Sequence, residues 1–168
     1  GDHWLSAMEF IKSGKIGQLR KVNIWGNFRY GIGAKKIADS LPPSDVDFNM
    51  WLGPAPQRSF NTARFHGSWR MFWDYGGGLL SDWGVHLLDI ALWAKDITEM
   101  PDSVVANGGN FAFKDHDHET FDTMNVSWQK GDYIINWQQN VGLESGPYGR
   151  SYRLEFVGND ARLVIDRN

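Results

Sequence analysis

Cysteine is absent from the 168 residues of this chain, and its absence excludes a disulfide framework, a thiolate metal site and a thiol nucleophile. An excess of positive charge is also missing, because 17 Lys and Arg residues stand against 20 Asp and Glu residues, a net charge of −3. Affinity for nucleic acid depends on clustered cationic side chains, so we expect no nucleic-acid partner. No apolar run approaches the ~20 residues that span a bilayer, so we expect no membrane partner.

Tryptophan, by contrast, is abundant, with nine residues. A chain of this length suits one domain with a sizeable hydrophobic core, and we expect most of the tryptophans to lie there. Aromatic faces also suit the apolar faces of sugar rings, so some of these side chains are candidates for a binding surface.

Periodicity predicts an early helix, a long strand, an irregular stretch, a central helix and a series of late strands. Apolar residues at positions i, i+4 and i+7 predict an amphipathic helix over residues 3–13, and alternation predicts a strand from Val22 to Tyr30. Short glycine-containing turns join later strands near residues 103–113, 124–129, 133–138, 152–156 and 163–165. The predicted fold class is α+β, with a predominantly antiparallel open sheet built as a meander, a mixed sheet as the alternative, and helices packed on one face.

The irregular stretch, residues 31–68, is rich in turn formers, which is typical of a functional excursion or a partly disordered segment. Its Gly31-Ile32-Gly33 segment fails as a dinucleotide-binding fingerprint, because Lys36 stands where the third glycine belongs and no βαβ pattern surrounds it. Within residues 47–64, Trp51 is followed by Leu-Gly-Pro-Ala-Pro. Two interpretations of this loop are open, a cover over a substrate cleft and a surface loop anchored by Trp51.

The central element spans residues 76–93 and begins with three glycines, which leave the backbone free to adopt positive φ. Ser81 or Asp82 then offers a side-chain oxygen that can cap a helix. The helix that follows is apolar on nearly all sides, a pattern that predicts burial.

Three ionisable residues of this helix, Asp82, His86 and Asp89, stand at i, i+4 and i+7 and so share one face. Such groups are costly on a buried helix unless they are paired or take part in chemistry. In the structural interpretation Asp82 caps the helix, His86 is a satisfied core histidine and Asp89 meets an arginine. In the functional interpretation they form a site.

The run Asp-His-Asp-His-Glu at residues 115–119 contains good ligands for divalent cations. Adjacent residues in a loop cannot all converge on one ion, and no partner cluster appears elsewhere in the sequence. We therefore expect a solvated loop between strands at this position and no metal site.

The run Trp-Arg-Met-Phe-Trp-Asp-Tyr-Gly-Gly-Gly at residues 69–78, followed by Asp82-Trp83-Gly84-x-His86-x-x-Asp89, closely resembles the substrate-domain signature of the Gfo/Idh/MocA oxidoreductases. The resemblance covers most of the chain. It implies a nicotinamide-dependent dehydrogenase that oxidises a sugar, polyol or related secondary alcohol by hydride transfer. It also implies that His86 is the general acid/base and that Asp82 is its partner or a ligand of the substrate; histidine is the usual base near neutral pH.

Arg70, Trp73 and Tyr75 lie just upstream of this pair, where the resemblance makes them candidate substrate-binding residues. Their alternative role as packing residues is equally open. For Asp89 we expect a structural role.

Two parts of the family's pattern are missing: a glycine-rich nucleotide-binding domain and a Lys from a Glu-Lys-Pro-like motif. We therefore interpret residues 1–168 as a single substrate-binding and oligomerisation domain excised from a longer protein. We expect NAD or NADP to serve the full-length protein, and we expect the chain alone to bind neither tightly and to be inactive. A cytoplasmic and an exported location both stay open.

Two other functions compete with the dehydrogenase: an NAD-dependent glycosidase that works through a keto-sugar, and a non-catalytic carbohydrate-binding or assembly module. We also expect a homo-oligomer formed through the open face of the sheet. Trp25, Ile134 and Val164 fall on that face in the predicted alternation and predict an exposed apolar patch there. Family members that resemble this sequence pair through that face.

Overall fold

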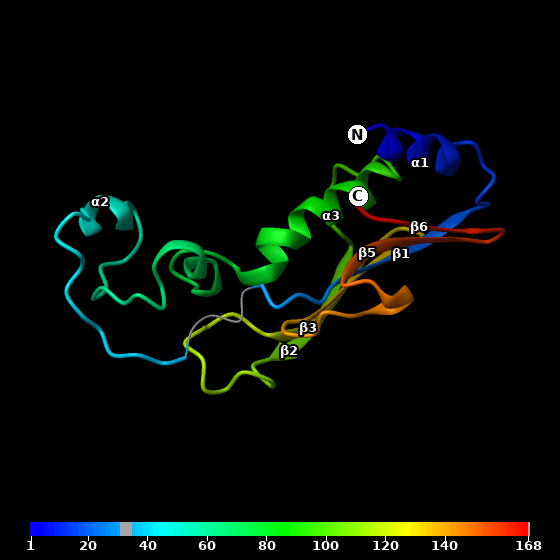
Figure 1. Ribbon diagram of the computed structural model, residues 1–168. Coiled ribbons are helices and arrows are strands. Elements are labelled where there is room, and N and C mark those ends of the chain that lie inside the picture. Colours follow the sequence, from blue (N-terminus) through cyan, green and yellow to red (C-terminus); the bar gives the residue numbers. More distant parts are fainter. Residues whose placement is uncertain (31–34, 168) are drawn as a thin grey trace.

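A computed structural model of the protein describes residues 1–30 and 35–167, and in this part of the chain six strands form one sheet (Figure 1). The strand order is β2-β3-β4-β1-β5-β6. The bounds are Leu19–Gly26 for β1, Ser103–Gly109 for β2, Thr123–Lys130 for β3, Tyr133–Asn140 for β4, Tyr152–Gly158 for β5 and Arg162–Ile165 for β6. The predicted α+β class is confirmed. The segment Gly31–Gly33 lies outside the described residues.

Strand β1 lies at the centre of the sheet, parallel to β4 and antiparallel to β5. The expected hairpins β3–β4 and β5–β6 are present. A plain meander was therefore wrong in one respect, because β1 is inserted between β4 and β5. A hairpin can be predicted from the turn residues between its two strands. The pairing of β1 with β4, by contrast, is a long-range contact without a local sequence signal.

Helices cover one face of this sheet. Helix α1 (Asp2–Lys12) and helix α3 (Val85–Trp93) both lie on that face (Figure 1). Their apolar side chains meet the inward-facing residues of the strands in one core, which contains Met8, Ile11, Leu87, Ala91, Val22, Ile24, Ile135, Trp137, Leu154 and Phe156. The predicted helix near residues 3–13 and the one-sided layer of helices are confirmed.

The first strand is shorter than the alternation suggests, because it ends at Gly26 rather than Tyr30. Asn27 is buried there and turns its side chain into the end of the sheet. Its Nδ2 donates to the Ser145 carbonyl at 2.9 Å, and its Oδ1 accepts from the Asn140 backbone N–H at 3.1 Å. On the β4 side the Asn27 side chain thus bonds the Asn140 backbone, and the pairing of β1 with β4 ends at Gly26.

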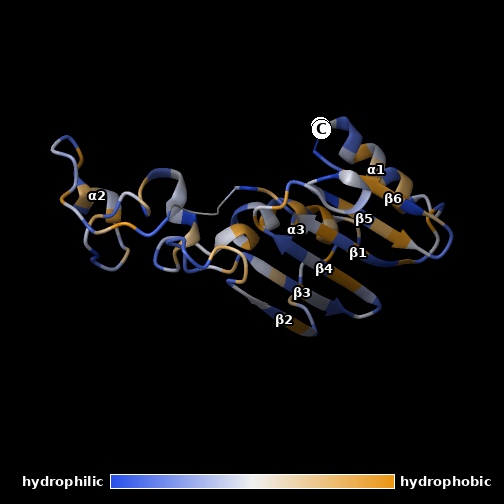
Figure 2. Cartoon of the chain, turned by 60° about the horizontal axis from the view of Figure 1, so that its bottom comes forward, coloured by the Kyte–Doolittle hydropathy of each residue, from blue (hydrophilic) through white to orange (hydrophobic). Residues whose placement is uncertain are grey.

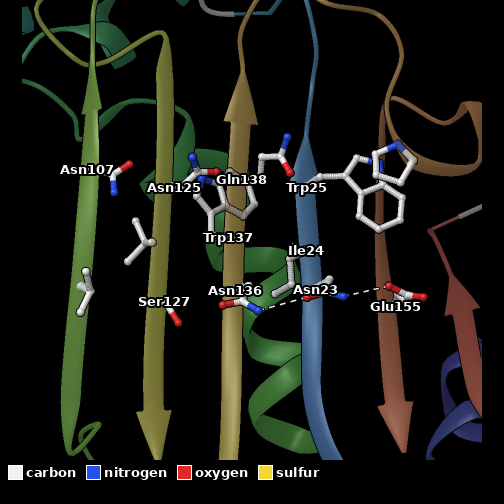
Figure 3. A pocket seen from close by; sticks show the side chains of 13 residues that line it. Asn23, Ile24, Trp25, Asn107, Asn125, Ser127, Asn136, Trp137, Gln138 and Glu155 are labelled. Carbon is white, nitrogen blue, oxygen red and sulfur yellow. Dashed lines mark hydrogen bonds between the residues drawn. The ribbon is translucent and has the colours of Figure 1, made fainter.

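The open face of the sheet is more polar than expected. A row of hydrogen bonds crosses it, with Asn136 donating to Asn23 at 3.1 Å and Asn23 donating to Glu155 at 2.8 Å (Figure 3). Trp25 is only 2% exposed, and its indole N–H donates to the Arg150 carbonyl at 2.9 Å. The expectation that Trp25 forms an exposed apolar patch was therefore wrong, because the chain's own segment beyond β4 covers it.

Residues 35–75 extend beyond the sheet as a separate lobe (Figures 1 and 2). The lobe contains the short helix α2 (Phe48–Leu52) and the 3₁₀ helix η1 (His66–Met71). It has its own aromatic cluster, in which neighbouring ring centroids lie 5.2 to 5.5 Å apart; the cluster consists of Phe48, Trp51, Phe60, Phe65 and Tyr75. Aromatic packing, rather than regular secondary structure, stabilises this irregular stretch.

The loop between β2 and β3 fastens the lobe to the sheet. The backbone N–H groups of Glu119 and Thr120 both donate to the Met71 carbonyl, at 2.9 and 3.1 Å. The Glu119 carboxylate also pairs with Arg58 of the lobe at 3.1 Å. Among residues 1–30 and 35–167, no helix has the length and the apolar character needed to cross a membrane.

Candidate functional site

The triple-glycine turn fits its surroundings because it has no side chains. A Cβ atom on Gly76 would lie 2.8 Å from the Arg70 carbonyl oxygen. Gly78 has φ +72°, and a Cβ there would lie 2.7 Å from the Thr120 side chain. The turn therefore brings the backbone at Arg70 and the loop at Thr120 close to the start of the central helix.

The central helix begins with a π-helical turn, η2 (Leu80–Gly84), which continues into α3. The predicted side-chain cap was wrong, since neither Ser81 nor Asp82 caps the first turn. Ser81 instead accepts from the Gly77 N–H at 3.0 Å and donates to the Gly78 carbonyl at 3.2 Å, which braces the glycine turn. Asp82 lies within the π turn, a feature that is rare and often found at functional sites.

Asp82 and Arg70 are brought together as an ion pair. The Arg70 Nε donates to the Asp82 Oδ1 at 3.1 Å, and both side chains are partly buried. The Arg70 guanidinium also lies 4.5 Å from the centre of the Trp69 ring. Stacking and pairing together hold the Asp82 carboxylate in one position.

Tyr30 is a member of this cluster that the sequence reasoning missed. Burial, and then its hydrogen bond to the Asp82 carboxylate, raise the pKa of the Tyr30 phenol to about 12. Asp82 therefore accepts from a phenol as well as from a guanidinium. In the sequence analysis Tyr30 is only the last residue of the expected strand, and no sequence feature relates it to Asp82.

His86 lies one helical turn beyond Asp82, on the exposed side of α3. Its ring centre is 6.4 Å from that of Trp83, and it has no hydrogen-bond partner among the described residues. Asp89 is also exposed. The central helix is thus buried on one side only, through Leu87 and Ala91, and the expectation of burial nearly all round was wrong. The exposed side offers His86 to an incoming molecule.

Trp73 and Tyr75 take different positions. Trp73 is 59% exposed, with its ring edge-on to Phe121. The Tyr75 ring packs edge-on against Trp51, 5.2 Å between centres, inside the aromatic cluster of the lobe. Of the three upstream candidates, Arg70 is the one with a hydrogen bond to Asp82 in the described part of the chain.

Tyr75 and the loop around Trp51 line an open hollow, here called the lobe cavity. Its volume is about 410 Å³, and it is lined by Trp51, Leu52, Pro54, Ala55, Pro56, Trp69, Asp74 and Tyr75. The loop of residues 47–64 therefore builds a wall of this hollow as well as packing through Trp51. Trp69 belongs both to the cavity wall and to the stack on Arg70.

The loop of residues 115–119 is less solvated than expected. The His118 side chain is only 2% exposed and lies 3.8 Å from the equally buried Asp122 carboxylate. Burial lowers the pKa of His118. No group of three or more His, Cys, Asp or Glu side chains in the described ranges is arranged to hold a metal ion.

Comparison with known proteins identifies the chain's relatives. The sequence profile described as "Oxidoreductase family, C-terminal alpha/beta domain", from the Gfo/Idh/MocA group, matches residues 9–157. No curated protein matches.

Solved structures with the same fold include aldose-aldose oxidoreductase from Caulobacter crescentus complexed with glycerol, at TM-score 0.60 and 18% identity over 98% of this chain and 37% of that one. Scyllo-inositol dehydrogenase from Lactobacillus casei, with bound NAD(H) and scyllo-inositol, has TM-score 0.57 and 18% identity over 99% of this chain and 39% of that one. WlbA dehydrogenase from Bordetella pertussis, in complex with NADH and UDP-GlcNAcA, has TM-score 0.56 and 14% identity over 96% of this chain and 39% of that one. The chain thus spans about two fifths of the length of these relatives.

Proposed function

Because the chain belongs to the Gfo/Idh/MocA oxidoreductase family, we propose that residues 1–168 are the substrate domain of an NAD(P)-dependent dehydrogenase for a sugar, polyol or related secondary alcohol. The observation that carries the proposal is the arrangement at the start of the central helix. Asp82 is held by Arg70, and His86 is exposed one turn further along. The glycerol, scyllo-inositol and UDP-GlcNAcA bound by similar structures support a hydroxyl-rich substrate.

Oxidation of a secondary alcohol requires a base to take the hydroxyl proton while hydride leaves the carbon. In our proposal His86 takes that proton, since its ring is free to meet a substrate hydroxyl. Asp82 accepts a hydrogen bond from the same or a neighbouring hydroxyl, and Arg70 orients the carboxylate. Trp73 and Tyr75 remain proposed substrate-binding residues, with Tyr75 acting through the lobe cavity.

A nicotinamide bound elsewhere in a longer protein would supply the hydride acceptor. The part of the chain that the structure describes contains no βαβ unit with a glycine-rich turn, so its residues do not fit the pyrophosphate of a dinucleotide. We place the NAD or NADP site in another part of a longer protein, and we propose that this chain alone is inactive. We further propose that the chain forms a homo-oligomer through the open face of its sheet.

His86→Ala in the full-length protein tests the catalytic assignment. We expect kcat to fall roughly 10²–10⁴-fold, the usual contribution of a general acid/base group, with the fold unchanged. Asp89→Asn is the matched control, because Asp89 is exposed on the same helix one turn away, and it should keep the activity within a small factor. Steady-state kinetics on a polyol panel gives the measurement, and wild-type turnover in His86→Ala would remove His86 from the mechanism.

A further inference from the structure

We propose that the lobe cavity is a second sugar-binding subsite, which holds a ring joined to the reacting sugar. The substrate is then a glycoside or short oligosaccharide rather than a free polyol. This inference rests on the proposed function and deepens it, since it names the substrate class of the same site.

The walls of the lobe cavity suit the face of a pyranose ring. Trp51, Trp69 and Tyr75 contribute aromatic surface, and two prolines add apolar surface to the lining. Trp51 is fixed by its stack on Phe48, with 5.5 Å between ring centres, so the surface exists before a ligand binds. The C–H hydrogens on a sugar face carry partial positive charge, which the negative faces of aromatic rings attract. The volume of about 410 Å³ lies within the roughly 300–1,000 Å³ of typical ligand pockets.

Asp74 gives the cavity a hydrogen-bond acceptor. Its Oδ2 accepts from Arg58 at 2.9 Å, and among the described residues its other oxygen has no hydrogen-bond partner. An ionised carboxylate accepts about four hydrogen bonds, so Asp74 retains capacity for sugar hydroxyls. Arg58 is already shared with Glu119 at 3.1 Å, which leaves one negative charge in excess around the cavity. A neutral, hydroxyl-rich ligand therefore fits, and a phosphate-bearing ligand is repelled.

The cavity is connected to the proposed catalytic residues through two side-chain contacts. Trp69 lines the cavity and stacks on Arg70, 4.5 Å from guanidinium to ring centre. Arg70 in turn bonds Asp82 at 3.1 Å. A ring in the cavity thus lies next to the residue that orients the carboxylate, the position expected for the neighbouring unit of a glycoside.

Ala55→Phe tests the subsite by filling the cavity, which Ala55 lines, while leaving Asp82 and His86 untouched. Met50→Phe is the matched control, since Met50 belongs to α2, is exposed and does not line the cavity. Saturation-transfer NMR and calorimetry on the full-length protein would use maltose, cellobiose and lactose as probes, with glucose, galactose and UDP for comparison.

We expect at least one disaccharide to bind more tightly than its component sugars. Its affinity should fall about tenfold or more in Ala55→Phe and stay unchanged in Met50→Phe. Asp74→Asn keeps the shape of the cavity and should weaken disaccharide binding several-fold, so the test holds even if Ala55→Phe fails to fold. The absence of disaccharide binding, equal binding in Ala55→Phe or Asp74→Asn, or tighter binding of UDP in the cavity would each overturn the proposal.

The subsite and the catalytic assignment fail separately. Disaccharide binding is measured at equilibrium and should persist in His86→Ala, whatever that variant does to turnover. If His86→Ala is fully active while Ala55→Phe loses disaccharide binding, the proposed dehydrogenase mechanism is wrong and the proposed subsite is supported. The reverse pattern removes the subsite alone.

Discussion

At the scale of single residues, His118 makes the stability of the fold depend on pH. Neither of its ring nitrogens has a hydrogen-bond partner among the described residues. Burial, the largest cause, lowers its pKa; the charges of Asp122 and Asp117 oppose that shift, and those of His116 and Lys36 add to it. The folded protein therefore resists protonation of His118 more than the unfolded chain does.

The sign of the effect follows from this difference. Below the ordinary histidine pKa of about 6.5 the unfolded chain binds a proton that the folded protein does not, so the free energy of unfolding falls as pH falls. His118→Phe should flatten the dependence below about pH 6.5. Urea unfolding at several pH values gives the measurement, with His3→Gln at an exposed position as control. An unchanged slope in His118→Phe would contradict this account.

The sequence indicated the candidate side chains Asp82 and His86 but not Tyr30, which bonds Asp82. Asp82 and His86 stood out because their spacing and chemistry are local features. Tyr30 could not be found, because it reaches Asp82 through the fold and stood at the end of an alternating segment. His118 was misplaced for a similar reason, since a polar run suggests solvent and only the packing of the loop against the lobe buries one member.

At the scale of elements, the glycine turn before η2 sets the position of Asp82. Gly78 combines φ +72° with Thr120 atoms at 2.7 Å from the place of a Cβ, whereas Gly131 in the β3–β4 turn has φ +55° and nothing within 4 Å. Gly131→Ala should therefore cost only the backbone strain of roughly 1 kcal/mol, and Gly78→Ala should cost more, up to about 3 kcal/mol.

Thermal unfolding and kinetics of the two variants measure this difference. Gly78→Ala should also lower kcat, because the clash displaces the glycine turn and with it the π turn that contains Asp82. Gly131→Ala should leave kcat unchanged. Equal stability losses in the two variants would show that the contact with Thr120 does not constrain the turn.

The elements that the sequence predicted well are those with local signals. The amphipathic helix near residues 3–13 and the hairpins with glycine turns are examples. The helix start was wrong because the π turn already begins at Leu80, so Ser81 and Asp82 lie within the turn rather than at its N-cap. The end of β1 was wrong because the Asn27 side chain bonds the end of β4 and the Ser145 carbonyl, which no alternation in the sequence reveals.

At the scale of the whole molecule, the sheet separates two surfaces with different tasks. Helices α1 and α3 cover one face, which carries the core and the candidate site, and the lobe extends beyond the sheet (Figures 1 and 2). The open face carries hydrogen-bonded amides and a 430 Å³ hollow over the central strands (Figure 3). Amide side chains both donate and accept, so a second copy of the same face can satisfy them.

Val105 and Val104 allow a matched test of the proposed self-association. They are neighbours on β2 and are 68% and 57% exposed, but they point to opposite faces of the sheet. Val105 lies on the open face beside the hollow, in register with Ser127, whereas Val104 pairs with Trp128 on the helix side. Val105→Glu should place like charges in the interface and weaken association roughly tenfold, about 1.4 kcal/mol, while Val104→Glu should leave it unchanged. Sedimentation velocity at micromolar concentration measures both, and a wild-type protein that stays monomeric, or equal effects of the two variants, would contradict an interface on the open face.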